Sequence, residues 1–240
     1  MRGIDKRWVI LGVLLVAAVA LNSRSIDLSN IGVLMLRFAL LFPAIILHEV
    51  AHGYTAYLLG DPTAKRMGRL TLNPIKHVDP VGTVILPIAL LVMSGGAFFF
   101  GYAKPVPFNP RNFKNERTGM LLTGIAGPVT NIALAVVFGI GLRFFPETGP
   151  VWLGYVFTGL YYFAYFNLVL AFFNLVPVPP LDGSRVLQWF LPDALRDAYH
   201  SLERYGFLAL IALTWVFPGL FSAYLNVTVE PVFRLLTGMA

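Results

Sequence analysis

The sequence predicts an all-α polytopic membrane protein with five or six transmembrane helices and a re-entrant or kinked segment around residues 81–108. Two features of composition support this fold: 57% of the 240 residues are hydrophobic, and only 12% are charged. A third feature is that the apolar residues gather in long runs. A water-soluble domain of this length needs more polar surface than 18 basic and 12 acidic side chains provide. The composition therefore excludes a soluble globular enzyme and a disordered chain.

Six apolar stretches are candidate spans. They cover residues 8–21, 31–59, 81–100, 118–142, 151–178 and 205–225. A helix needs about 20 residues to cross the hydrocarbon core, and the second, fourth, fifth and sixth stretches are long enough. The first is short and follows a basic start, so it fits either a retained span or a cleavable signal peptide. We expect residues 1–240 to form a single integral-membrane domain.

The basic residues lie in blocks between the apolar stretches, which argues against a nucleic-acid partner. Three or four Lys and Arg fall in each of four segments, at residues 1–7, 60–80, 103–117 and 179–204. Residues 22–30 and 143–150 carry one each. By the positive-inside rule, the four basic segments lie on the cytoplasmic side. The sequence therefore predicts a multi-pass membrane protein with a defined orientation.

The third apolar stretch, residues 81–100, has basic segments on both sides. If both flanks are cytoplasmic, the stretch must double back rather than cross. Pro87, the Ser94-Gly95-Gly96 run and the prolines of residues 104–107 would each interrupt a straight helix. Irregular backbone at membrane depth is tolerated only where protein or a water-filled cavity satisfies it, so we expect this region to line a site. A full span kinked at proline is the alternative.

The second apolar stretch contains the run His48-Glu49-Val50-Ala51-His52. On a helix, residues four apart share one face, so His48 and His52 can present two imidazoles to one metal, with Glu49 beside them to move a proton. Ionisable groups inside a membrane helix cost several kcal/mol unless a partner compensates them. A bound cation is such a partner, and the absence of cysteine excludes thiolate ligands. The pattern predicts a metal site.

Asp182 is the candidate for a third protein ligand. It follows a proline-rich run at residues 177–180 that cannot form a regular helix, and Gly183 permits a tight turn after it. The orientation of the spans puts the ends of the second and fifth stretches on the same side, so both candidate sites lie at similar depth. The alternative is that Asp182 only caps a helix starting near Ser184.

These motifs together resemble the site-2 protease family of intramembrane zinc metalloproteases. The resemblance is carried by HEVAH at residues 48–52, GPVTN at residues 127–131 and the run 174–183 ending in Leu-Asp-Gly. The blocks DPTAK, LNP, HVDP and AKPVP between residues 61 and 107 look like the compact prokaryotic branch, which has no PDZ or CBS domains. We expect this chain to belong to that branch.

The resemblance implies one Zn²⁺ per chain, bound by His48, His52 and Asp182, with Glu49 as the catalytic acid and base. It also implies hydrolysis of a peptide bond within or near the transmembrane segment of a membrane-protein substrate, as in regulated intramembrane proteolysis. The implied partners are transmembrane substrates and the lipid bilayer. The implied location is the prokaryotic cell membrane, with the active site nearer the cytoplasmic side.

Asn131 and Asn174 are amides in otherwise apolar stretches. Each either forms an interhelical hydrogen bond or holds the substrate or oxyanion, and the resemblance favours the second role for Asn174. Two other functions remain open at this point: a membrane metal transporter, and an inactive protease-like protein that binds membrane proteins. A transporter does not require the His48-to-His52 spacing together with a remote Leu-Asp-Gly, and Glu49 argues against an inactive scaffold.

Overall fold

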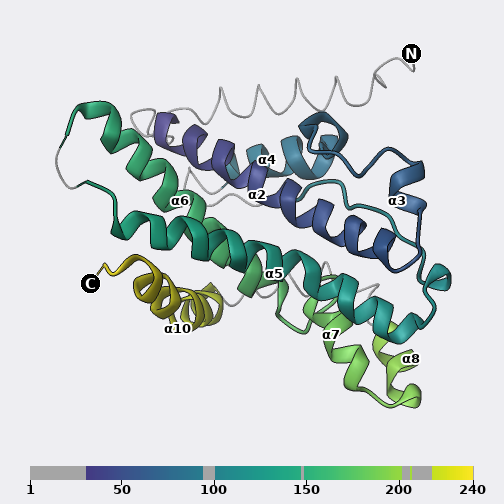
Figure 1. Ribbon diagram of the computed structural model, residues 1–240. Helices are drawn as coiled ribbons and strands as arrows, with labels where there is room; N and C mark the ends of the chain where they lie inside the picture. The colour runs from purple at the N-terminus through teal and green to yellow at the C-terminus, as the bar shows by residue number, and fades with distance from the viewer. Residues whose placement is uncertain (1–30, 94–100, 147–148, 202–205, 207–217, 240) are drawn as a thin grey trace. The chain divides into compact units, whose positions relative to one another are not determined.

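The computed structural model describes residues 31–93, 101–146, 149–201, 206 and 218–239. The first apolar stretch, residues 8–21, lies outside them, as do residues 94–100 of the third stretch and residues 205 and 207–217 of the sixth. Every regular element of the described residues is helical, which confirms the all-α prediction (Figure 1). The α-helices are α2 (Ile31–Leu58), α3 (Thr63–Arg66), α4 (Leu86–Met93), α5 (Glu116–Arg143), α6 (Val151–Asn174), α7 (Gly183–Phe190), α8 (Asp193–Ser201) and α10 (Pro218–Thr237).

The chain divides into two compact units. One comprises Met1–Phe38 and Asn73–Pro105, and the other comprises Ala39–Leu72 and Val106–Ala240. The boundary falls within α2. All site residues that the sequence predicts belong to the second unit, so the candidate site can be described within that unit. The prediction that residues 1–240 form one membrane domain stays a prediction.

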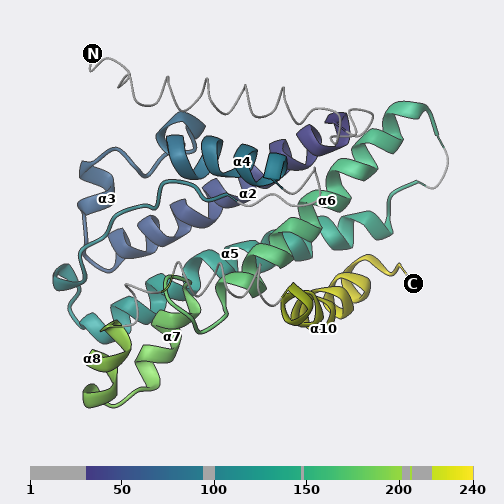
Figure 2. The same ribbon diagram turned by 180° about the vertical axis from the view of Figure 1, so that it is seen from behind.

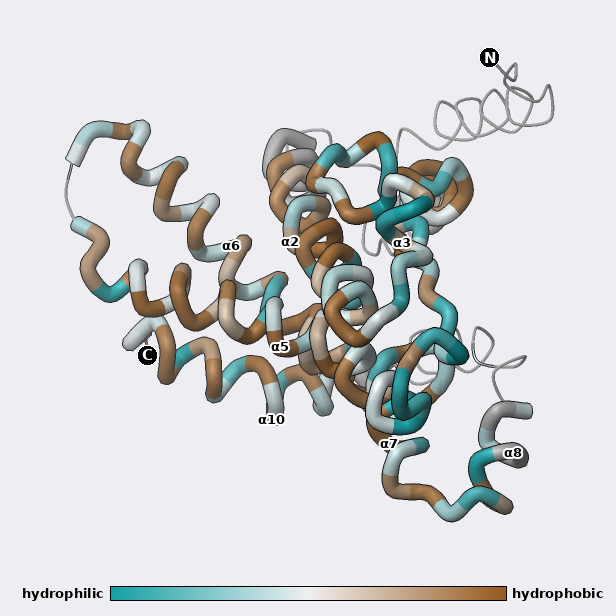
Figure 3. The backbone as a smooth tube through the Cα atoms, turned by 45° about the vertical axis from the view of Figure 1, so that its right-hand side comes forward, coloured by the Kyte–Doolittle hydropathy of each residue, from teal (hydrophilic) through white to brown (hydrophobic). Residues whose placement is uncertain are grey.

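Helices α5 and α6 form the main helical pair of the second unit. With 28 and 24 residues, both are long and apolar enough to cross a membrane, and hydrophobic residues run along each of them (Figure 3). Asn115 caps α5 because its side chain accepts the N–H of Thr118 at 3.0 Å. The predicted stretches 118–142 and 151–178 correspond to these helices, except that α6 ends at Asn174, before the proline-rich run.

Helix α10 packs against α5 and α6, and its end contradicts the sequence prediction. The shared core consists of Ala135, Ala164, Leu168, Val229 and Phe233. The predicted stretch ended at residue 225, whereas the helix continues to Thr237 (Figure 2). Glu230 and Arg234 interrupt the apolar run without interrupting the helix, because they are one turn apart and form an ion pair at 3.0 Å.

In the first unit, residues that precede and follow residues 84–100 lie together. Tyr102 donates its N–H to the Gly82 carbonyl at 3.0 Å, and Lys104 donates to the His77 carbonyl at 2.9 Å. The Thr83 hydroxyl also donates to the Tyr102 carbonyl at 2.9 Å. A side chain at position 82 would meet the Tyr102 ring, so glycine is required for this approach. These contacts join residues 77–83 to residues 102–104, and the prediction that residues 81–100 double back in the membrane stays a prediction.

Asp61 anchors the loop that follows α2 in the second unit. Its buried carboxylate accepts the N–H and hydroxyl of Thr63 at 3.1 and 2.5 Å, the Asn112 amide at 2.6 Å and the Asn109 N–H at 2.7 Å. Burial alone would raise the pKa of Asp61, but these hydrogen bonds outweigh burial and lower the pKa. The ionised carboxylate thereby ties residues 109–112 to the end of α2.

Because the folded-state pKa of Asp61 is lowered, its stabilising contribution is present above the unfolded value of about 3.9 and is lost as the pH falls below it. We expect Asp61→Asn to cost about 1–3 kcal/mol at neutral pH, since the new NH₂ group must face a donor of Thr63, Asn109 or Asn112. Thermal unfolding in detergent at pH 7 and at about pH 2.5 measures both effects. The melting temperature of the wild type should approach that of the variant as the pH falls. Equal melting temperatures at pH 7 would contradict the anchoring role of Asp61.

Candidate metal centre

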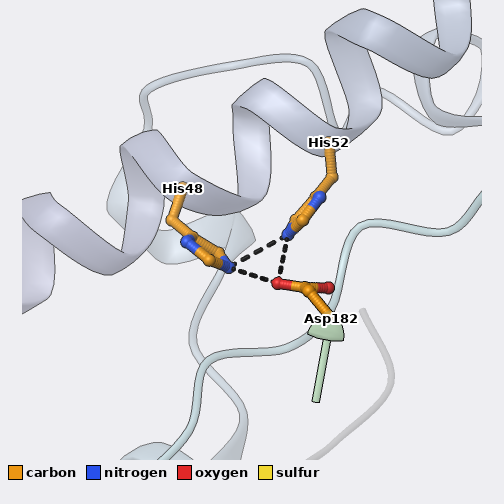
Figure 4. Close-up of side chains that lie close together, drawn as sticks. All are labelled: His48, His52 and Asp182. Carbon is orange, nitrogen blue, oxygen red and sulfur yellow. Dashed lines mark hydrogen bonds and ion pairs between the residues drawn. The ribbon is translucent and has the colours of Figure 1, made fainter. Parts of the chain in front are cut away.

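Three predicted side chains meet at one point in the second unit (Figure 4). His48 and His52 extend from one face of α2, and Asp182 extends from the segment before α7. The two Nε2 atoms lie 2.9 Å apart, and each lies 3.1 Å from Oδ2 of Asp182. The three residues are only 4–6% exposed. The structure therefore brings His48, His52 and Asp182 together in a buried group, as the sequence predicts.

The outer nitrogens of both imidazoles face hydrogen-bond acceptors. Nδ1 of His52 lies 2.6 Å from the Thr123 carbonyl oxygen, and Nδ1 of His48 lies 2.5 Å from Oδ1 of Asn131. An oxygen that only accepts requires a proton on the facing nitrogen, so both Nδ1 atoms donate. In the neutral imidazoles, both Nε2 lone pairs then point toward Asp182.

Asp182 supplies an ionised oxygen to the same point. Arg185 donates from Nη1 to Oδ1 at 2.8 Å, which leaves Oδ2 turned toward the imidazoles. With neutral imidazoles, two nitrogen lone pairs and one carboxylate oxygen therefore converge on one point. This donor set fits a divalent cation such as zinc.

The segment before α7 folds so that Asp182 reaches the histidines. Three prolines interrupt the backbone after α6, and the peptide between Pro179 and Pro180 is cis. A Cβ at Gly183 would lie 2.2 Å from the Leu175 carbonyl oxygen, so only glycine allows this close return of the chain. Helix α7 begins at Gly183, but the Asp182 side chain makes no capping hydrogen bond to it. The capping alternative for Asp182 is therefore wrong.

Glu49 lies beside the histidines on α2 and is half-buried. Its Oε2 accepts the N–H of Val106 at 2.8 Å. A Cβ at Gly53 would lie 2.5 Å from the Val106 side chain, so the glycine next to His52 lets this segment approach the helix closely. The backbone of residue 106 thus holds the predicted acid and base in one orientation.

The segment of residues 106–109, which we call the site strap, contacts other parts of the site in succession. After Val106, the Phe108 ring lies 5.0 Å from the guanidinium carbon of Arg185, the residue that holds Asp182. Asn109 then donates to Asp61. The site strap therefore links Glu49 and Arg185 to the buried carboxylate of Asp61. The sequence predicted that this region lines a site, but it predicted none of these individual contacts.

The two predicted amides lie in different places. Asn131, on α5, is fully buried and contacts His48 directly. Asn174, the last residue of α6, donates to the Leu170 carbonyl of its own helix at 2.9 Å, and this contact involves none of the three clustered residues. Instead, Asn167 of α6 reaches the site, because its Oδ1 lies 2.6 Å from Nδ2 of Asn131. Sequence reasoning missed Asn167, although the same signal, an amide in an apolar helix, marks it.

Comparison with known proteins gives consistent matches. Residues 148–217 match peptidase family M50. YwhC of Bacillus subtilis is 43% identical over 171 residues, which cover 70% of this chain and 74% of the relative. Rip2 of Mycolicibacterium smegmatis is 29% identical over 188 residues, which cover 78% of this chain and 69% of the relative. Both relatives are named as zinc metalloproteases. No solved structure gives a significant match.

These matches, together with the buried His-His-Asp group, define the class of the protein as a zinc metalloprotease. The chain belongs to peptidase family M50, the site-2 protease family. The resemblance predicted from the sequence motifs is thereby confirmed at the level of the family, and the enzyme class favours a protease over the metal transporter. Family membership and the apolar helices α5 and α6 make it a membrane protein.

Gly127 of α5 provides a test of the metal centre. A Cβ at this position would lie 2.5 Å from Cε1 of His48 and 2.5 Å from Nε2 of His52. We expect Gly127→Ala to displace the imidazoles and weaken zinc binding by roughly 10- to 100-fold, although alanine is the better helix former. Zinc affinity is measured by competition with a chelator. Gly141→Ala is the matched control, because a Cβ at position 141 meets open space; equal losses in both variants would contradict the account.

Proposed function

We propose that this protein is an intramembrane zinc endopeptidase that hydrolyses a peptide bond within or near the transmembrane segment of a membrane-protein substrate. The observation that carries the proposal is the burial of the His-His-Asp group among apolar helices. Thr123 and Asn131 of the membrane-length helix α5 contact the two histidines directly. A hydrolytic centre held between such helices favours a substrate that itself lies in the membrane.

In this proposal, His48, His52 and Asp182 hold one zinc ion per chain. When bound, zinc polarises the scissile carbonyl and lowers the pKa of water to about 7. Glu49 takes a proton from the attacking water and then delivers it to the leaving amine nitrogen. The Val106 N–H orients the Glu49 carboxylate for both transfers, and Arg185 keeps the free oxygen of Asp182 turned away from the reacting groups.

The solvent exposure of the four side chains supports the proposed roles of three ligands and one acid and base. The three proposed ligands are 4–6% exposed, which suits groups that hold a cation permanently. Glu49 is half-buried, as a group that exchanges protons with water and substrate must be. A substrate helix must unwind locally before its carbonyl can be attacked, since its own backbone hydrogen bonds otherwise cover that carbonyl. The proposed partners are therefore transmembrane proteins and the surrounding bilayer.

We also propose that the protein is a multi-pass protein of the prokaryotic cytoplasmic membrane, with five or six spans and its active site nearer the cytoplasm. The site lies toward the C-terminal part of α2 and just after α6. Both are followed by basic segments, residues 60–80 and 179–204, which the positive-inside rule assigns to the cytoplasm. In this topology, residues 81–100 enter the membrane and return to the same side.

Single cysteines test the topology, because the natural chain has none. We expect Met67→Cys and Lys114→Cys, both at exposed positions, to react with a membrane-impermeant maleimide only from the cytoplasmic side. Phe144→Cys, at a position 82% exposed, should react only from the opposite side. Labelling of positions 67 and 114 from opposite sides would show that residues 81–100 cross the membrane.

Proteolysis is tested by reconstituting the purified protein in liposomes with candidate single-span substrates. We expect Glu49→Gln to retain about one zinc per chain and to cleave roughly 10²- to 10⁴-fold more slowly, because it loses proton transfer and not a ligand. Asp182→Ala should lose both zinc and cleavage. Equal cleavage by wild type and Glu49→Gln would disprove the mechanism, and undiminished zinc in Asp182→Ala would remove that residue from the ligand set.

A further inference from the structure

Asn167 has no role in the mechanism described above, yet it is fully buried in α6 and contacts the residue that holds His48. We propose that Asn167 is a positioning residue for the metal centre. Acting through Asn131, it fixes the proton of His48 on Nδ1 and thereby leaves the Nε2 lone pair free for a metal ion. The inference rests on the proposed metal site and adds a residue that its motifs do not contain.

The chain of contacts begins at a backbone carbonyl of α6. Nδ2 of Asn167 lies 2.8 Å from the carbonyl oxygen of Phe163, one turn earlier. A carbonyl oxygen only accepts hydrogen bonds, so the NH₂ group of Asn167 must face it. The other end of this amide, Oδ1, therefore faces α5, where it lies 2.6 Å from Nδ2 of Asn131.

The orientation of Asn131 follows from that of Asn167. Its NH₂ group faces two acceptors, Oδ1 of Asn167 at 2.6 Å and the Ala44 carbonyl oxygen at 3.4 Å. Its own oxygen then faces Nδ1 of His48 at 2.5 Å. Because that oxygen cannot donate, His48 must carry its proton on Nδ1. A backbone carbonyl of α6 thus determines the tautomer of an imidazole on α2 through two side-chain amides.

The two histidines differ in the kind of acceptor that faces Nδ1. His52 donates directly to the Thr123 carbonyl, which is part of a helix backbone and cannot turn over. His48 donates to a side-chain amide, which can rotate to present NH₂ instead of oxygen and would then favour a proton on Nε2. Asn131 and Asn167 are both fully buried, so a wrong orientation leaves polar groups unsatisfied in an apolar bundle. Asn167 is therefore specifically required for His48.

Asn167→Leu tests the inference because it keeps a similar volume and removes the hydrogen bonds. We expect it to weaken zinc binding by roughly 10- to 100-fold, as loss of an outer hydrogen-bond partner of a ligand does. The matched control is Thr158→Val, which removes a comparable bond within α6, from the Thr158 hydroxyl to the Gly154 carbonyl at 2.8 Å. The control should bind zinc as the wild type does.

A rescue variant separates orientation from packing. A carboxylate at position 131 accepts from His48 in any orientation, so N131D/N167L should recover most of the zinc affinity that N167L loses. Restored affinity, together with a cobalt(II) absorption spectrum like that of the wild type, would support positioning. If N167L binds zinc like the wild type, or if the double variant stays as weak as N167L, the inference is overturned.

A measurement on the wild type avoids any problem of variant folding. In the zinc-free protein labelled with ¹⁵N-histidine, at a pH where His48 is neutral, we expect the resonances of His48 to show the proton on Nδ1. A proton on Nε2 would overturn the inference even if zinc binds. A wild-type chain that binds no zinc would instead refute the proposed function, so the two failures are distinguishable.

Discussion

The convergence of three donor atoms on one buried point is the constraint on which the rest of the site depends. Two imidazole nitrogens and one carboxylate oxygen lie about 3 Å from one another, and the Nδ1 atoms face the oxygens of Thr123 and Asn131. Such a group can hold a divalent cation once both Nε2 atoms are free of protons. Separate partners, namely Thr123, Asn131 and Arg185, hold the three donors in place, so the fold prepares the site in advance of metal binding.

Helix α5 is the element that most of these supports share. It provides the Thr123 carbonyl and the Asn131 amide, and between them Gly127 leaves the space that the imidazoles occupy. The carboxylate proposed to be catalytic is held differently. Glu49 depends on the site strap, which is fixed at its far end by the buried carboxylate of Asp61. The two histidines are thus positioned by helix packing, whereas Glu49, the proposed acid and base, is positioned by a loop.

Much of this arrangement could be predicted because its signals are local in the sequence. The spacing of His48 and His52 needs only the period of one helix, and long apolar runs predicted α5 and α6. The prolines and Gly183 indicated an irregular turn that would present Asp182. The end of α10 was not predicted, since Glu230 and Arg234 break the apolar run but neutralise each other on the helix surface.

The remaining site contacts depend on depth and rotation between helices, which hydropathy does not specify. Asn167 and Asn174 give the same sequence signal, seven residues apart on α6. Only packing against α5 determines that Asn167 meets Asn131, whereas Asn174 bonds within its own helix. The contacts of Val106 and Thr123 with the site use backbone atoms, which carry no residue-specific signal at all.

X-ray absorption at the zinc edge of the purified protein tests the central claim most directly, because it reports the ligands of the bound ion without a variant. The account predicts a spectrum with two imidazole ligands, further oxygen ligands at about 2.0–2.2 Å and no sulfur. A zinc spectrum that requires one imidazole or none would contradict the claim that His48 and His52 meet Asp182 around a metal ion.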